Sequence, residues 1–206
     1  MRITAGTLKN KEVLSYKDKD KVLRPTTSKV RQAVFNLLNH GRFLPELDII
    51  NDENPSLIEG RTIADFFCGT GIVSYEAISR GAVRAIMIDI SEQNIACARN
   101  NAKLLNVTEK CLFLRADVMQ LPHAQYQCDV VFLDPPYNRN MLNQAIASII
   151  KSEWVKAGGI IIAEHSKRED VTEHPQTKII DKRKYNNSNV TILKFLGVDA
   201  NGALIK

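Results

Sequence analysis

Residues 65–71 have the sequence Asp65-Phe66-Phe67-Cys68-Gly69-Thr70-Gly71, in which two glycines follow a short run of β-forming residues. An amphipathic stretch follows at once, so a strand, a glycine turn and a helix are expected in direct succession. In an open α/β sheet such a turn lies at the carboxyl edge of the strands, where a crevice opens. Gly69 and Gly71 would let the backbone approach a ligand closely. The stretch therefore predicts an α/β fold with a nucleotide-like ligand at this turn.

The chain beyond this turn alternates short β-rich runs with longer amphipathic stretches. The predicted strands are Thr62–Phe67, Arg84–Ile88, Cys111–Leu114, Asp129–Leu133 and Gly159–Ala163. The predicted helices are Ile72–Ser79, Glu92–Leu105 and Leu142–Lys151, and Gly81 and Gly158 are expected to end the elements that precede them. This order is typical of an α/β, doubly wound, mostly parallel sheet with helices on both faces.

The C-terminal part changes character. Two β-rich runs, Lys178–Lys184 and Val190–Leu196, flank the turn-rich residues 186–189. Such a pattern predicts an antiparallel hairpin added to the parallel sheet.

The N-terminal part is expected to contain a helix over Lys29–Leu38, for which Thr26, Thr27 and Ser28 offer caps. Lys29 and Arg31 are predicted to turn away from its apolar face, which consists of Val30, Val34, Leu37 and Leu38. Residues 40–61 contain several Gly, Pro, Asn and Asp residues and predict a linker loop. The chain then divides into a basic extension with a helix (1–39), this linker (40–61), the α/β domain (62–197) and a tail (198–206).

Positive charge is concentrated at the N-terminus. The 206 residues carry a net charge of +5, and residues 1–31 hold nine Lys or Arg against three acids, a net +6. A basic arm on a near-neutral body favours capture of a polyanion, because each neutralised phosphate releases a condensed counterion. A solvated, flexible tail would carry the same charges.

Other features of the composition exclude several classes of protein. No apolar run approaches the roughly 20 residues of a membrane span, and the N-terminus lacks a hydrophobic signal core, so a cytoplasmic protein is expected. The four cysteines, Cys68, Cys97, Cys111 and Cys128, are widely spaced and are expected to be free thiols. The four histidines are equally scattered, so no metal is implied.

Asp65 separates this turn from that of the dinucleotide oxidoreductases. Their fingerprint has a third glycine where this chain has Ser74, and it binds a pyrophosphate, which a carboxylate would repel. A carboxylate suits a ligand that carries an ammonium and a sulfonium, as S-adenosylmethionine does. A structural turn with an incidental aspartate is the alternative.

Two further acids are placed to hold such a cofactor. Asp89 ends the second predicted strand eighteen residues beyond Gly71 and could accept ribose hydroxyls. Asp117 could accept the adenine amino group, although a surface aspartate that caps the following turn explains it as well. The predicted cofactor-binding residues are Asp65, Cys68, Gly69, Gly71, Asp89, Ile90, Asp117 and Val118.

Residues 130–137, Val-Val-Phe-Leu-Asp-Pro-Pro-Tyr, run from a buried strand into an acid, two prolines and an aromatic ring. Proline restricts the backbone, so the carboxylate of Asp134 and the carbonyl of Pro135 are expected to form a rigid pair of acceptors. Such a pair suits a nucleobase amino group, whose delocalised lone pair must be reoriented toward a methyl donor, while Tyr137 stacks on the flipped base. A proline-stiffened loop with a core-capping tyrosine is the alternative. The predicted catalytic residues are Asp134, Pro135, Pro136 and Tyr137.

At these two motifs the chain resembles the class I methyltransferases, with residues 65–71 as the cofactor loop and residues 134–137 as the Asp-Pro-Pro-Tyr amino-methylation motif. More narrowly, it resembles the bacterial small-subunit rRNA guanine-N2 methyltransferases. These begin with Arg-Ile-x-x-Gly and carry Arg-Pro-Thr-x-x-x-Val-Arg-x-x-x-Phe-Asn before the cofactor loop. This chain has Arg2-Ile3-Thr4-Ala5-Gly6 and, later, Arg24-Pro25-Thr26, Val30-Arg31 and Phe35-Asn36. The resemblance covers nearly the whole chain and implies a seven-stranded sheet with an antiparallel seventh strand.

The resemblance implies methyl transfer from S-adenosylmethionine to the N2 amino group of a guanine in 16S rRNA, with S-adenosylhomocysteine as product and no metal. The expected substrate is an assembling or assembled small ribosomal subunit, bound by a monomer. RNA contacts are predicted at Arg2, Arg24, Thr26, Lys29 and Arg31. The linker is longer than a minimal family linker, and Cys68 occupies a position often held by another small residue.

Three other functions share parts of this pattern. A DNA adenine-N6 methyltransferase would use the same catalytic residues, although no separate target-recognition domain is visible. A protein-glutamine methyltransferase usually presents Asn-Pro-Pro-Tyr where this chain has Asp134. A non-catalytic RNA-binding assembly factor could keep the fold without the activity.

Overall fold

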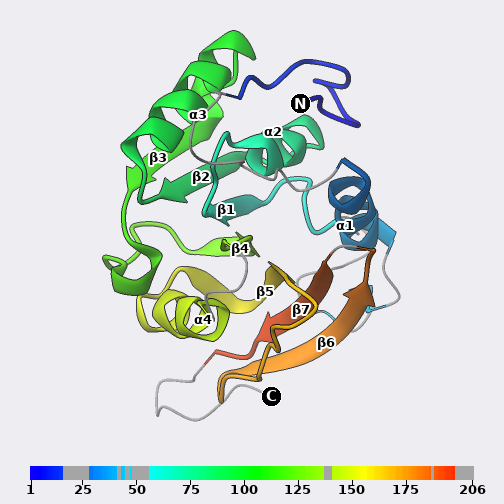
Figure 1. Cartoon of the computed structure of the whole chain (residues 1–206), viewed down its shortest axis with the longest axis vertical. Coiled ribbons are helices and arrows are strands. Elements are labelled where there is room, and N and C mark those ends of the chain that lie inside the picture. The colour runs from blue at the N-terminus through cyan, green and yellow to red at the C-terminus, as the bar shows by residue number, and fades with distance from the viewer. Residues whose placement is uncertain are drawn as a thin grey trace.

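The computed structural model describes residues 1–15, 28–40, 43–44, 47, 56–136, 141–186 and 188–197. They contain a seven-stranded sheet with the order β3-β2-β1-β4-β5-β7-β6 (Figure 1). The strands are β1 Thr62–Phe66, β2 Arg84–Asp89, β3 Cys111–Arg115, β4 Cys128–Leu133, β5 Val155–His165, β6 Thr177–Lys184 and β7 Asn189–Phe195. Strands β1 to β5 pair in parallel, whereas β7 pairs antiparallel with both β5 and β6. The predicted mostly parallel sheet and its antiparallel hairpin are confirmed.

The helices lie close to their predicted bounds. They are α1 Ser28–His40, α2 Ile72–Ser79, α3 Glu92–Leu104 and α4 Leu142–Lys151, with two short 3-10 helices, η2 Thr108–Lys110 and η3 Val118–Gln120. Helices α2 and α4 have the predicted bounds, α3 ends one residue earlier, and α1 is longer at both ends. Within the described ranges, no helix combines the length and the apolar character needed to cross a bilayer.

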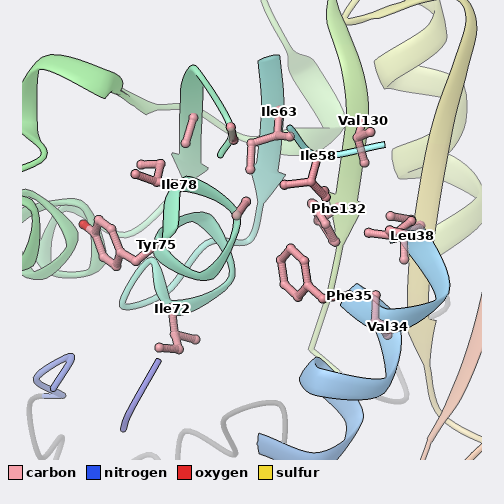
Figure 2. Close-up of a cluster of buried hydrophobic side chains, with 14 of the residues drawn as sticks. Val34, Phe35, Leu38, Ile58, Ile63, Ile72, Tyr75, Ile78, Val130 and Phe132 are labelled. Atoms are coloured by element: carbon pink, nitrogen blue, oxygen red, sulfur yellow. The ribbon is translucent and has the colours of Figure 1, made fainter. Parts of the chain in front are cut away.

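Strand side chains alternate between two apolar layers, one on each face of the sheet. On one face, Phe132 of β4 and Ile162 of β5 belong to a core that includes residues of α1, α2 and α3. On the other face, Leu133 and Ala163 pack with residues of α4. Figure 2 shows the first layer, in which Phe35 of α1 lies beside Phe132, with 5.5 Å between the ring centroids. The face that carries α1 is the one on which the candidate site lies.

Helix α1 is held to this face by its apolar side chains. Val30, Val34 and Leu38 are buried, as predicted, while Leu37 is only half-buried. Phe35 lies outside the predicted apolar face and is nevertheless 0% exposed. Its burial places α1 directly beside the end of β4.

Arg31 of α1 contradicts the predicted orientation, because its side chain is 2% exposed. Its Nε lies 3.4 Å from Oε2 of Glu76 on α2, and its Nη2 donates to the carbonyl of Arg2 at 2.6 Å. A buried guanidinium is tolerated when a carboxylate and hydrogen bonds compensate its charge. The prediction that Arg31 turns away from the core is therefore wrong. Glu76 lies 45 residues further along the chain, so helix periodicity could not reveal this partner.

The N-terminal segment, residues 1–15, lies near α2 (Figure 1), and its Thr4 is hydrogen-bonded to the same glutamate. Thr4 donates to Glu76 from its backbone N–H at 2.8 Å and from its hydroxyl at 2.6 Å. Arg80, one turn further along α2, pairs with Glu76 at 2.8 Å. Burial alone would raise the pKa of Glu76, but the hydrogen bonds from Thr4 and the charge of Arg80 outweigh it and lower that pKa. Glu76, which is 0% exposed, thus joins the N-terminal segment, α1 and α2.

Gly6 explains why the N-terminal segment can approach α2 so closely. Its φ is 79°, and an added Cβ would lie 1.7 Å from the carbonyl oxygen of Ser79. The same carbonyl accepts the N–H of Thr7 at 2.8 Å, and the Ser79 hydroxyl accepts the N–H of Leu8 at 2.8 Å. Ile3 is 1% exposed. The Arg-Ile-x-x-Gly block therefore has a structural explanation in contacts with α2.

Two further sequence predictions meet different outcomes. Gly81, with φ 101°, directly follows the C-cap of α2 and is confirmed as a helix end. Gly158, with φ 77°, lies inside β5, where the β4–β5 register shifts after Cys128, so the prediction that it ends the preceding element is wrong.

Part of the predicted linker loop, residues 40–61, belongs to the core or to a helix. Leu57 and Ile58 are each 0% exposed, and His40 belongs to α1.

Candidate active site

The turn after β1 is held in place by two backbone hydrogen bonds. Cys68 N–H donates to the carbonyl of Ile88 on β2 at 3.1 Å, and Gly71 N–H donates to the carbonyl of Cys68 at 2.8 Å. Gly69 has φ 54°, in the left-handed region that favours glycine. No described atom lies within 4 Å of the point that a Cβ on Gly69 would occupy. Open space therefore faces the backbone of this residue, where a ligand could approach.

Gly71 has a different role, because its surroundings are filled. Its φ is 80°, and an added Cβ would lie 2.8 Å from the ring of Tyr75 and 2.9 Å from the sulfur of Met87. Tyr75 is fully buried, and its hydroxyl donates to the carbonyl of Ala98 on α3. Gly71 is also the N-cap of α2. It allows the turn to pack against α2 and β2.

Asp65 lies beneath this turn and is 3% exposed. Its Oδ2 accepts the N–H of Ser74 at 3.2 Å and the Ser74 hydroxyl at 2.8 Å. Burial raises the pKa of Asp65 to about 7, the neighbouring charge of Asp89 adds to the rise, and the bonds from Ser74 oppose it. The serine that replaces a third glycine thus holds a carboxylate that a nearby cation would keep ionised.

Asp89, at the end of β2, shapes the turn through its hydrogen bonds. Its carboxylate accepts from the N–H of Gly69 at 3.0 Å, the N–H of Ser91 at 2.9 Å and the side chain of Asn94 at 2.9 Å. A carboxylate has about four lone-pair positions, so one acceptor position is left for a hydroxyl. The next residue, Ile90, is 59% exposed and offers apolar surface beside it.

Asp117 caps the 3-10 helix η3. A capping role is the alternative to cofactor binding that the sequence leaves open for this residue. Its Oδ1 accepts the N–H of Met119 at 2.9 Å and caps η3. The remaining lone pairs of its carboxylate are compatible with a second acceptor role. Val118 is 2% exposed, so its side chain belongs to the core and a ligand could use its backbone alone.

Asp134 and Pro135 follow directly after β4. Leu133 of β4 is in register with Phe66 of β1 on one side and with Ala163 of β5 on the other. Neighbouring strands lie roughly 4.8 Å apart, so Asp134 emerges between the ends of β1 and β5. Pro135 is buried and Pro136 exposed. Tyr137 lies outside the described residues, and its stacking role stays a prediction.

A cavity connects these elements, with about 370 Å³ of empty space including the part that opens to solvent. Its lining comes from α1 (Arg31, Val34, Phe35), from β1 and the start of α2 (Asp65, Val73), and from the ends of β4 (Phe132, Leu133, Asp134) and β5 (Ile162, Glu164). Figure 2 shows Val34 and Phe35 of α1 on the same side as Phe132. The structure therefore brings Asp65 and Asp134 into one cavity.

Glu164 is a member of this cavity that the sequence analysis missed. It is 8% exposed, and its Oε1 accepts the hydroxyl of Ser188 at 2.8 Å. The signal was present, because Glu164 directly follows the apolar run 160–163 just as Asp134 follows the run 130–133. The pattern that indicates Asp65, Asp89 and Asp134 is an acid at the carboxyl end of a predicted parallel strand. Glu164 fits the same pattern.

The residues predicted to contact RNA are placed differently from one another. Arg2 and Lys29 are exposed. Arg24 and Thr26 lie outside the described residues. Arg31 is 2% exposed and paired with Glu76, so almost none of its guanidinium is open to a phosphate at the surface.

All four cysteines of the chain are free thiols. Burial raises the pKa of Cys68 well above its usual value, so the thiol in the glycine turn stays neutral. In the part of the chain that the structure describes, no three His, Cys, Asp or Glu side chains are grouped to hold a metal ion.

Known proteins match both the sequence and the fold. The family described as "Conserved hypothetical protein 95" matches residues 1–194. An uncharacterized methylase of Rickettsia prowazekii is 26% identical, with 95% of this chain and 98% of that protein covered. A ribosomal RNA small subunit methyltransferase D of Buchnera aphidicola is 25% identical over 97% of this chain and 93% of that protein. A solved structure described as "Putative methyltransferase yhhF from Escherichia coli" has a TM-score of 0.75 at 19% identity and covers 95% of this chain and 97% of its own. The fold is that of the class I methyltransferases.

Proposed function

The chain belongs to the family described as conserved hypothetical protein 95, and on this premise we propose that it methylates the N2 amino group of a guanine in 16S rRNA, with S-adenosylmethionine as donor. The observation that carries the proposal is the single cavity lined by both Asp65 and Asp134. One carboxylate suits a cationic methyl donor and the other suits an amino group, so donor and acceptor would meet there. The relative named as a small-subunit rRNA methyltransferase supports the choice of substrate.

The residues present fit S-adenosylmethionine, which supplies an electrophilic methyl group on a sulfonium when bound. The open space at Gly69 leaves room for a ligand against the turn. Asp65 would balance the positive charge of the ligand, and the remaining acceptor position of Asp89 would take a ribose hydroxyl. Exposed Ile90 would pack on the adenine ring, and Asp117 would accept its amino group. Cys68, Gly71 and Val118 would shape the walls of the same site.

The amino group would be held by Asp134 and the carbonyl of Pro135. Hydrogen bonds from both N–H groups of the base to these two acceptors would turn the nitrogen lone pair toward the methyl group. Phe35 and Phe132 give the cavity apolar walls, which strengthen these bonds by excluding water. Tyr137 would stack on the flipped base, and Pro136 would stiffen the loop between Pro135 and Tyr137. Catalysis would then come from positioning and electrostatics, without a covalent intermediate on the protein.

The raised pKa of Asp65 predicts a pH-dependent affinity for S-adenosylmethionine. Since a cationic ligand favours the ionised carboxylate, binding must release a proton wherever Asp65 is protonated, that is, below about pH 7. We expect the affinity to rise by about tenfold per pH unit below this value and to level off above it. Calorimetric titration between about pH 5.5 and pH 8.5 measures this slope.

The matched control is Asp65→Asn, which keeps the shape but does not titrate. Its affinity should be weaker and independent of pH over the same range. An equally steep slope in this variant would assign the proton to another group.

The raised pKa of Asp65 also affects the stability of the free protein. The folded state holds this proton more tightly than the unfolded chain, so the contribution of Asp65 to the free energy of unfolding falls as the pH rises from 3.8 to about 7.

The basic residues of the N-terminal extension predict a salt-dependent affinity for RNA. We expect the double variant Arg24→Glu, Lys29→Glu to bind small-subunit rRNA more weakly and to flatten the plot of log affinity against log salt by about one unit per lost phosphate contact. The affinity for S-adenosylmethionine should not change. Filter binding over a range of salt concentrations measures the slope, and an unaltered slope would remove the arm from the RNA interface.

Two rival functions make different predictions for one experiment. Unmethylated small subunits and duplex DNA are offered separately to the protein with labelled S-adenosylmethionine. Label is expected in the 16S rRNA of the small subunits. Label in DNA alone would identify a DNA adenine methyltransferase, and absence of any cofactor binding would identify a non-catalytic assembly factor.

A further inference from the structure

The end of β5 places Glu164 next to Asp134. Leu133 of β4 and Ala163 of β5 are in register, so Asp134, which follows the end of β4, lies level with Glu164, the penultimate residue of β5. Side chains two positions apart on a strand share a face, which puts Glu164 on the face of Ile162. That face is covered by α1. Asp134 and Glu164 both line the cavity described above.

The surroundings of Glu164 hold its carboxylate in a fixed position away from bulk water. It is 8% exposed and accepts a hydrogen bond from the hydroxyl of Ser188, which is itself 2% exposed and directly precedes the antiparallel strand β7. A carboxylate in a largely apolar cavity forms stronger hydrogen bonds than one in water. It also discriminates between bases, because a carboxylate attracts a group that donates a hydrogen bond and repels one that can only accept.

The bases that carry an amino group differ at the ring nitrogen beside it. In guanine the N2 amino group adjoins N1–H, a second donor, whereas in adenine the N6 amino group adjoins an N1 that can only accept. A pair of adjacent carboxylates therefore matches guanine and repels adenine. We propose that Glu164 determines the specificity for guanine by accepting N1–H while Asp134 accepts the N2 amino group. The inference rests on the proposed function, since it names the residue that selects the base at the same site.

The first test uses Glu164→Gln, which keeps the size of the side chain and an acceptor for Ser188 but removes the charge. On unmethylated small subunits, kcat/KM for methyl transfer should fall by about 10- to 100-fold, because a charge-assisted hydrogen bond to the base is lost. The Kd for S-adenosylmethionine should not change. The matched control is Glu169→Gln, because Glu169 is also 8% exposed but does not line the cavity, and it should retain wild-type kcat/KM.

The second test combines the variant with a change in the base. Once the methylated nucleotide has been located in the wild-type product, subunits are reconstituted with 2-aminopurine at that position, which keeps the amino group but lacks N1–H. Wild-type protein should lose about 10- to 100-fold on this substrate, and Glu164→Gln should lose almost nothing further. Equal losses in both proteins, or wild-type kcat/KM in Glu164→Gln on guanine, would overturn the inference. A wild-type protein that methylates no rRNA would instead overturn the proposed function.

Discussion

An Asp134→Ala variant is expected to lose methyl transfer by about 100- to 1,000-fold in kcat, the range found when a group that stabilises a transition state is removed. The reason is that Asp134 would supply one of the two acceptors that orient the amino nitrogen. Asp134 lies at the end of β4, whereas the residues proposed to hold the cofactor lie at or after the ends of β1, β2 and β3. Affinity for S-adenosylmethionine should therefore match that of the wild type. Single-turnover transfer to unmethylated small subunits separates the chemical step from binding.

Two further variants make this result specific. Asp134→Asn keeps an acceptor oxygen without the charge, so its kcat should lie between those of the wild type and Asp134→Ala. Asp170→Ala removes an exposed acid that does not line the cavity and should leave kcat unchanged. Transfer by Asp134→Ala within about tenfold of the wild type would exclude the proposed role.

A Glu76→Ala variant is expected to lower the free energy of unfolding by about 3–5 kcal/mol, as breaking a buried ion pair on one side typically does. Glu76 is 0% exposed and compensates the charges of Arg31 and Arg80 while accepting two hydrogen bonds from Thr4. Its removal would leave two guanidinium groups without their carboxylate. Urea denaturation measures the loss, and amide exchange should show that residues 1–15 lose protection first.

The control for this variant is an ion pair at the surface. Glu92 lies 3.4 Å from Arg115, and their side chains are 70% and 63% exposed. Glu92→Ala should change the free energy of unfolding by less than about 1 kcal/mol, because solvent screens such pairs. A similarly small loss in Glu76→Ala would show that Glu76 does not connect the N-terminal segment, α1 and α2. If Glu76→Ala does not fold, Thr4→Ala removes one donor to the same carboxylate and should give a smaller loss.

The sheet could be predicted from the sequence because each of its strands has a local signal. The runs that contain Asp65 or lead into Asp89 and Asp134 are bounded by turn residues, and these boundaries agree with the structure to within one or two residues. Strand β5 begins four residues before its predicted start at Gly159, because Gly158, the residue before it, is predicted to end the preceding element. The structure accommodates both glycines in an irregular stretch where the register with β4 shifts. A shift of this kind depends on the partner strand, which no local pattern reveals.

The site could be predicted only where its residues lie next to recognisable turns. Asp65 and Asp134 were found in this way, and the structure places both in one cavity. Arg31 was predicted at the surface because charged residues on a short helix usually face solvent. Its actual partner, Glu76, belongs to another helix, and that contact depends on how α1 crosses the sheet. Glu164 carries the same local signal as Asp134, an acid directly after an apolar run, and only its contact with Ser188 depends on the distant hairpin.

Contacts within the protein explain residues 2–6, the N-terminal block that resembles the rRNA methyltransferases. Thr4 and Gly6 contact α2, Ile3 is buried in the core, and the backbone of Arg2 accepts a hydrogen bond from Arg31. These residues stabilise the wall of the cavity that α1 provides. The RNA-contacting role proposed for the extension therefore falls to its exposed side chains, such as Lys29.

Mass spectrometry of the nucleosides in 16S rRNA from cells that lack this protein decides whether it methylates a guanine. One N2-methylguanosine that is present in wild-type 16S rRNA should be missing, and it should return when the wild-type gene is supplied but not with the Asp134→Ala variant. An unchanged set of methylated guanosines would contradict the proposed function, as would loss of a methylated adenosine in their place.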